Sequence, residues 1–109
     1  MRQIDHHIVG GAGGSARRSD VFDPNNGGVQ AAVALGDAAL LDRAVAAAKA
    51  AQPAWAAVNP QRRARVMFDY KRLVEDHIDE LAELLASEHG KVVADARGDV
   101  QRGLDVIEF

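Results

Sequence analysis

Through most of the chain after residue 36, apolar residues recur every three or four positions, the spacing of one face of an α-helix. This pattern predicts three helical segments, at about residues 37–51, 60–89 and 95–109. Asp37 can cap the first segment with its side chain. Pro53 is expected to stop that segment, because proline lacks the N–H that a helix interior needs.

The long middle segment has recognisable ends. Asn59 is a capping residue followed by Pro60, and proline is favoured at the first helical position. No further glycine or proline occurs until Gly90, which is expected to end the segment in a left-handed conformation. The segment exceeds the usual helix length, so a bend is expected near residues 76–79. Asp95 is a candidate cap for the last helix.

The residues before these helices follow another pattern. In VFDPNNGGVQAAVAL, two apolar runs flank DPNNGG, whose residues supply the fixed and positive φ angles of a chain reversal. A β-hairpin is therefore predicted over residues 21–35, preceded by a glycine-rich loop or short strand over residues 1–20. The predicted fold is mostly α with an N-terminal β-hairpin.

Composition narrows the class of protein. The chain has 109 residues, 48% hydrophobic and 27% charged, as soluble globular proteins do. Its net charge of −3 gives no attraction to nucleic acid, and no apolar run of about 18 residues could span a membrane. The start, MRQIDHHIVGG, lacks the apolar core of a signal peptide, which favours the cytoplasm. Cysteine is absent, so these residues contain no thiol nucleophile.

Two motifs suggest cofactor or metal chemistry, and neither is convincing. Gly11-x-Gly13-x-x-Ala16 imitates a dinucleotide-binding turn, but no helix follows to present its N-terminal amides to a pyrophosphate. A surface loop is the better interpretation. The histidines lack the spacing of metal ligands, so neither a cofactor-binding nor a metal-binding residue is assigned.

Arg102 lies three residues from both Asp99 and Asp105, the spacing of ion pairs within one helix. Taken residue by residue, a solvated arginine paired with one of these aspartates is the favoured interpretation. No catalytic residue is assigned.

The order of these elements resembles the N-terminal region of the aldehyde dehydrogenase superfamily. The shared features are the Asp-Pro turn before a Gly-Val strand, the alanine-rich helix ending in PAW, the RARV stretch, and Gly-Lys after the long helix. SEHGK and GDVQRGLDVIEF are most similar to the CoA-acylating methylmalonate-semialdehyde dehydrogenases. The apolar helical pattern also continues to the last residue. The resemblance implies an incomplete domain over residues 21–109, the front part of an α/β, Rossmann-like coenzyme-binding domain.

In such enzymes a cysteine thiolate attacks the aldehyde, hydride passes to NAD, and in this subgroup coenzyme A discharges the thioester. The resemblance thus implies a parent oxidoreductase that uses NAD and coenzyme A on a semialdehyde. This chain alone is expected to be inactive and to bind neither cofactor tightly. Its expected partner is the missing C-terminal part of the enzyme or a second copy, with no nucleic acid or membrane. The alternative is a stand-alone helical interaction module on an aldehyde dehydrogenase-derived scaffold.

The resemblance also gives Arg102 a role in substrate binding. An arginine in the setting GDVQRG lines the substrate entrance in the resembled subgroup, where a guanidinium suits the carboxylate remote from the aldehyde. If Val100 and Leu104 face the core, helical geometry turns Arg102 about 200° away from each of them.

Overall fold

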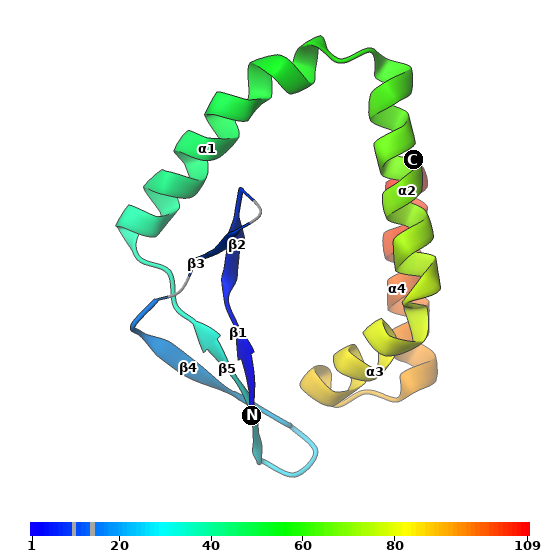
Figure 1. Ribbon diagram of the computed structural model, residues 1–109. Helices are drawn as coiled ribbons and strands as arrows, with labels where there is room; N and C mark the ends of the chain where they lie inside the picture. The colour runs from blue at the N-terminus through cyan, green and yellow to red at the C-terminus, as the bar shows by residue number, and fades with distance from the viewer. Residues whose placement is uncertain (10, 14) are drawn as a thin grey trace. The chain divides into compact units, whose positions relative to one another are not determined.

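The computed structural model describes residues 1–9, 11–13 and 15–109. The chain divides into two compact units, one of residues 1–22 and 27–57 and the other of residues 23–26 and 58–109. Figure 1 labels the strands and helices of both units.

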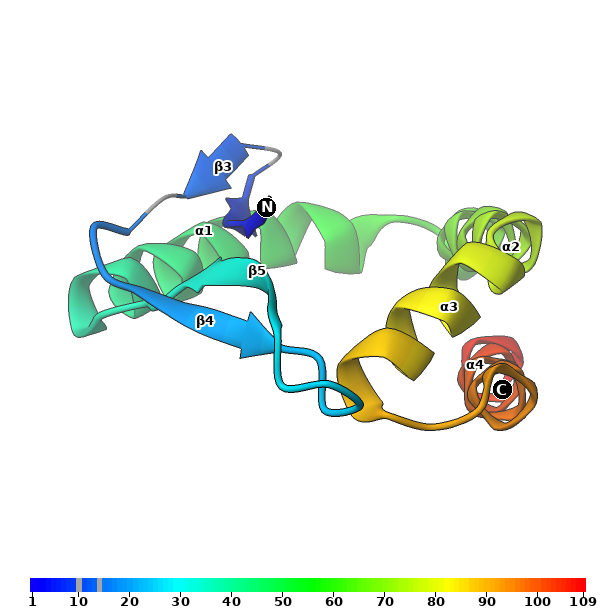
Figure 2. The ribbon, with the colours of Figure 1, turned by 90° about the horizontal axis from the view of Figure 1, so that it is seen from below.

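The first unit contains a three-stranded sheet in the order β1-β5-β4, formed by β1 (Arg2–Ile4), β4 (Arg18–Phe22) and β5 (Val29–Ala34). β4 and β5 are antiparallel and lie side by side (Figures 1 and 2), so the predicted hairpin is present, but its first strand already begins at Arg18. The early start is compatible with the polar residues of β4 because an edge strand tolerates exposed side chains. β1 joins the other side of β5 in parallel.

The prediction of a loop or one short strand over residues 1–20 understated the structure. β2 (His6–Ile8) and β3 (Gly11–Gly13) form a second, two-stranded antiparallel sheet, in addition to β1 and the start of β4. Gly10 and Gly14 of this predicted loop lie outside the described residues. Such short strands are held by their pairing with other segments, so a local pattern does not show them.

A single helix, α1 (Ala38–Ala57), completes the first unit. The Asp37 carboxylate accepts a hydrogen bond from the N–H of Leu40 at 2.7 Å, which confirms the predicted cap. The prediction that Pro53 ends this helix was wrong, because α1 continues to Ala57. Proline removes one backbone hydrogen bond, and the surrounding alanines, the strongest helix formers, favour continuation of the helix.

The second unit holds α2 (Pro60–Asp76), α3 (Ile78–His89) and α4 (Val93–Glu108). Figures 1 and 2 show α2 and α4 side by side, running in opposite directions. Asn59 Oδ1 accepts from the N–H of Gln61 at 2.8 Å, as a cap should. The predicted middle segment breaks at His77, inside the range where a bend was expected.

The predicted start of the last helix was wrong by two residues. α4 begins at Val93, and its cap position, Val92, makes no side-chain capping hydrogen bond. Asp95 lies instead within the first turn. A carboxylate there interacts favourably with the N-terminal end of the helix dipole, so the same residue type suits both positions.

The buried residues are mostly small. Ala82 and Ala86 of α3 form a core cluster with Ala96 of α4. Among the described residues, Leu40 and Leu104 are the only buried side chains larger than alanine. Large exposed apolar side chains of α2, of α4 and of the residue that follows α4 include Val66, Phe68, Tyr70, Leu73, Val106 and Phe109. The chain therefore leaves much of its apolar surface available for contact with other protein.

Gly90, which follows the last residue of α3, lies close to the turn of residues 23–26 within the second unit. Its φ of +78° is left-handed, which confirms the predicted helix end. A Cβ at this position would lie 2.9 Å from Cγ of Pro24. The turn is held by the Asp23 carboxylate, which accepts from the backbone N–H of Asn25 at 2.8 Å. Position 90 therefore requires glycine for both its conformation and its space.

Gly90→Ala should destabilise the second unit by at least about 1–2 kcal/mol. The left-handed conformation is unfavourable for alanine, and the added Cβ would clash with Pro24. Gly103→Ala is the matched control. Gly103 lies inside α4, and apart from its own helix backbone no atom of the described residues comes within 4 Å of its Cβ position. The control should stabilise by about 0.5–1 kcal/mol. Urea unfolding followed by circular dichroism measures both; an equal effect of the two changes would contradict this account of Gly90.

Candidate functional site

Arg102 lies on the outer face of α4. Leu104 is 1% exposed, and its burial fixes the rotation of the helix about its axis. The Arg102 side chain is 75% exposed. The predicted orientation of Arg102 away from Leu104 is therefore confirmed, as helical spacing requires.

The Arg102 guanidinium belongs to a cluster of three charged side chains, Lys91, Asp99 and Arg102, called the Asp99 cluster below. Arg102 Nη1 donates a hydrogen bond to Asp99 Oδ1, and Lys91 Nζ donates to Asp99 Oδ2. Asp105, the other aspartate at the predicted spacing, accepts instead from Gln101 at 3.0 Å. The structure thus pairs Arg102 with Asp99.

Sequence spacing did not identify Lys91 as part of this cluster. Lys91 follows Gly90 in the connection between α3 and α4, eight residues before Asp99. It lies two residues before the start of α4, and its side chain reaches Asp99 within that helix. The glycine that ends α3 was a visible signal of the connection, but not of which side chain would meet Asp99.

The electrostatics of the cluster follow from its contacts. The hydrogen bond from Lys91 lowers the pKa of Asp99 below its ordinary value, partial burial opposes this, and the charge of Arg102 adds to the lowering. With one carboxylate between two cations, the cluster carries a net charge of +1. An exposed guanidinium in such a setting can bind a carboxylate by charge-assisted hydrogen bonds.

Two further groups of ion pairs connect α4 to the other helices of its unit. Lys71 of α2 contacts Glu75 at 2.9 Å and Glu108 of α4 at 4.0 Å. The hydrogen bond from Lys71 to Glu75 is the largest cause of the raised pKa of Lys71. Arg97 of α4 pairs with Asp79 of α3.

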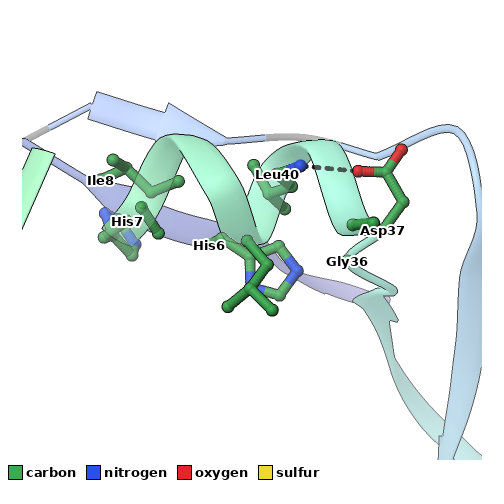
Figure 3. A pocket seen from close by; sticks show the side chains of 9 residues that line it. His6, His7, Ile8, Gly36, Asp37 and Leu40 are labelled. Carbon is green, nitrogen blue, oxygen red and sulfur yellow. Dashed lines mark hydrogen bonds between the residues drawn. The ribbon is translucent and has the colours of Figure 1, made fainter. Parts of the chain in front are cut away.

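The first unit contains a cavity of about 520 Å³ between β2 and the start of α1. Figure 3 shows His6, His7 and Ile8 of β2 and Leu40 of α1 around it, with the Asp37 carboxylate turned toward the N–H of Leu40. Nε2 of His6 is buried without a hydrogen-bond partner in the part of the chain that the structure describes. Asp37 is already engaged as the helix cap, so the cavity offers mainly apolar walls.

The glycine motif near the N-terminus does not form a dinucleotide-binding turn. Gly11 and Gly13 lie in β3, which pairs with β2 and is followed by β4 rather than by a helix. No group of three or more His, Cys, Asp or Glu residues that could hold a metal ion occurs within residues 1–9, 11–13 and 15–109. Over the same residues, no helix combines the length and apolar character needed to cross a membrane.

A sequence profile of the aldehyde dehydrogenase family matches residues 12–109, which is nearly the whole chain. The chain belongs to the aldehyde dehydrogenase family. The predicted fold class is confirmed: the chain corresponds to the N-terminal part of the coenzyme-binding domain of aldehyde dehydrogenases.

Relatives of the chain bear the names of semialdehyde dehydrogenases. A malonate-semialdehyde dehydrogenase of Pseudomonas aeruginosa is 37% identical over 106 residues, covering 95% of this chain and 21% of that protein. Malonate-semialdehyde dehydrogenase 1 of Bacillus licheniformis is 41% identical over 109 residues, covering 100% of this chain and 22% of that protein. The chain thus spans about a fifth of the length of these relatives.

Solved structures agree with this relationship. One named for methylmalonate-semialdehyde dehydrogenase, from Sinorhizobium meliloti 1021 and complexed with NAD, has 53% identity and a TM-score of 0.93. The match covers 100% of this chain and 23% of the Sinorhizobium meliloti protein. The structure of a 3,6-anhydro-L-galactose dehydrogenase has 30% identity and a TM-score of 0.91. The match covers 95% of this chain and 22% of that protein.

Removing the Lys91 charge by Lys91→Met should raise the pKa of Asp99 toward 3.8, its ordinary value, because the main cause of the lowering is lost. A lowered pKa stabilises the folded state above the ordinary value, and this contribution disappears as the pH falls through the lowered pKa. The measurement is an NMR titration of the Asp99 carboxyl group. Lys71→Met is the control and should leave the titration unchanged, because Lys71 contacts Glu75 and Glu108 rather than Asp99. An unchanged titration in Lys91→Met would contradict the assigned hydrogen bond.

Proposed function

We propose that this chain is the N-terminal portion of an NAD-dependent, CoA-acylating malonate- or methylmalonate-semialdehyde dehydrogenase, and that it is inactive by itself. One observation carries the proposal: 95–100% of the chain is similar to proteins with these names, while it accounts for only 21–23% of their length. The NAD bound in the Sinorhizobium meliloti structure supports the choice of coenzyme.

The chemistry of the chain supports its inactivity in isolation. Aldehyde oxidation through a covalent intermediate needs an activated nucleophile, and the chain contains no cysteine. In the proposed reaction, bound NAD would supply the hydride acceptor and coenzyme A the acyl acceptor. The glycine motif of this chain does not fit NAD, since Gly11 and Gly13 lie in a hairpin rather than before a helix. We propose that the chain contributes structural support and substrate binding to the parent enzyme.

The proposed partner is the remaining, catalytic part of the same kind of enzyme. Only two buried side chains of the described residues exceed alanine in size, while Val66, Tyr70 and Leu73 of α2 are about half exposed. Exposed apolar side chains that gather on one element are typical of a surface that contacts other protein. Contact with the catalytic part would cover such surface, and a second copy of the chain is the other candidate.

Arg102 is the residue proposed to bind substrate. Its guanidinium is exposed on the outer face of α4, and the Asp99 cluster to which it belongs has a net positive charge. A semialdehyde of this class carries a carboxylate at the end remote from the aldehyde, and arginine binds such a group through paired N–H donors. The proposed role of Arg102 is to hold this carboxylate.

The purified chain should produce no NADH from methylmalonate semialdehyde, NAD and coenzyme A. A chimera in which residues 1–109 replace the matching 23% of the Sinorhizobium meliloti protein should produce NADH and an acyl-CoA product. Absorbance at the NADH wavelength measures NADH formation, and mass spectrometry identifies the acyl-CoA product. NADH formation by the chain alone would refute its inactivity. A folded chimera without activity, beside an active unmodified relative, would favour the interaction-module alternative.

In the chimera, Arg102→Leu should raise KM for methylmalonate semialdehyde by about one to two decades and leave propanal almost unaffected. The reason is the loss of a charge-assisted contact of about 1.5–3 kcal/mol. Arg72→Leu is the matched control, since Arg72 is also exposed and paired within its helix, with Asp76 at 3.2 Å. Steady-state kinetics with both aldehydes provide the measurement. Equal losses for the two substrates would show a structural arginine, and no loss would place Arg102 outside the substrate site.

A further inference from the structure

The two oxygens of the Asp99 carboxylate are held by different cations. Lys91 Nζ contacts Oδ2, and Arg102 Nη1 contacts Oδ1. A guanidinium has several N–H groups, and the contact with Oδ1 occupies Nη1. Asp99 can therefore hold the Arg102 side chain in one orientation while other N–H groups remain to bind a second carboxylate.

The position of Lys91 decides the charge that Arg102 presents. An isolated Asp99–Arg102 pair would be neutral and would attract an anion weakly. The Lys91 side chain is 25% exposed, against 75% for Arg102, so lysine is the inner cation of the cluster and arginine the outer one. Lys91 offsets the carboxylate from the inner side, which leaves the positive charge at the exposed end.

The ion-pair group around Lys71 provides a contrast within the same unit. Lys71 is 26% exposed, close to Lys91, but it contacts two carboxylates, those of Glu75 and Glu108. That group has a net charge of −1, whereas the Asp99 cluster has +1. A partly buried lysine in an ion pair is thus not enough to attract an anion. The Asp99 cluster attracts an anion because it contains one more cation than carboxylates.

We propose that Lys91 and Asp99 are positioning residues for carboxylate recognition by Arg102. Asp99 orients the guanidinium, and Lys91 compensates the Asp99 charge so that Arg102 attracts the remote carboxylate of a short-chain semialdehyde. This inference rests on the proposed function of Arg102 and extends it to two residues that do not themselves touch the substrate.

The test uses the chimera with the Sinorhizobium meliloti protein and compares methylmalonate semialdehyde with propanal. Lys91→Met should raise KM for the carboxylated substrate about three- to tenfold, with kcat and the KM for propanal within about twofold of the unmodified chimera. Lys91→Arg should restore KM, because it returns the cation. Lys91→Gln provides a second neutral variant if Lys91→Met does not fold.

Asp99→Ala separates orientation from simple charge neutralisation. If Asp99 orients Arg102, this change should raise KM for methylmalonate semialdehyde about three- to tenfold. If Asp99 only competes with the substrate for Arg102, its removal should lower KM, and that result would overturn the positioning role. Lys71→Met is the matched control and should change the two KM values equally or not at all.

The outcomes distinguish this inference from the proposal on which it rests. If Arg102→Leu fails to discriminate between the two aldehydes, both the role of Arg102 and this inference are refuted. If Arg102→Leu discriminates while Lys91→Met and Asp99→Ala match the unmodified chimera, only the inference is refuted. A loss of kcat or of both KM values in the Lys91 variants would show a structural role instead.

Discussion

The burial of Leu104 is the constraint on which the candidate site depends. Leu104 is 1% exposed, and Ala96 on the same face of α4 contributes to the core with Ala82 and Ala86 of α3. The small side chains allow close packing of α3 and α4, and the buried leucine sets the rotation of α4. Since a helix turns by about 100° per residue, this rotation also places Arg102 toward solvent, with Asp99 partly exposed beside it. The site is therefore a consequence of core packing on the opposite face.

The same core is small for the length of the chain. Alanines make up most of the buried residues, while large apolar side chains on α2 and α4 remain exposed. Alanine contributes little apolar area when buried, so the helices gain limited stability from contacts within the chain. The chain corresponds to about a fifth of the length of its relatives.

Much of the secondary structure could be predicted because its causes are local. The caps at Asp37 and Asn59 act on N–H groups two or three residues away, and Gly90 ends its helix through its own φ angle. Pro53 misled the prediction because a single unfavourable residue competes with a long run of helix formers. The position of Arg102 on the outer face followed from helical spacing, whereas its proposed substrate came only from the family resemblance.

By itself, then, the sequence determined the family, the hairpin turn, the existence of the helices and the face on which Arg102 lies. Only the tertiary structure decided which distant segments meet: that β1 pairs in parallel with β5, that β2 pairs with β3, and that Lys91 takes the second oxygen of Asp99. Periodicity and caps depend on neighbours within a few residues. Strand pairing and cross-connections between helices depend on where the chain reverses and on the packing that follows, which no local pattern encodes.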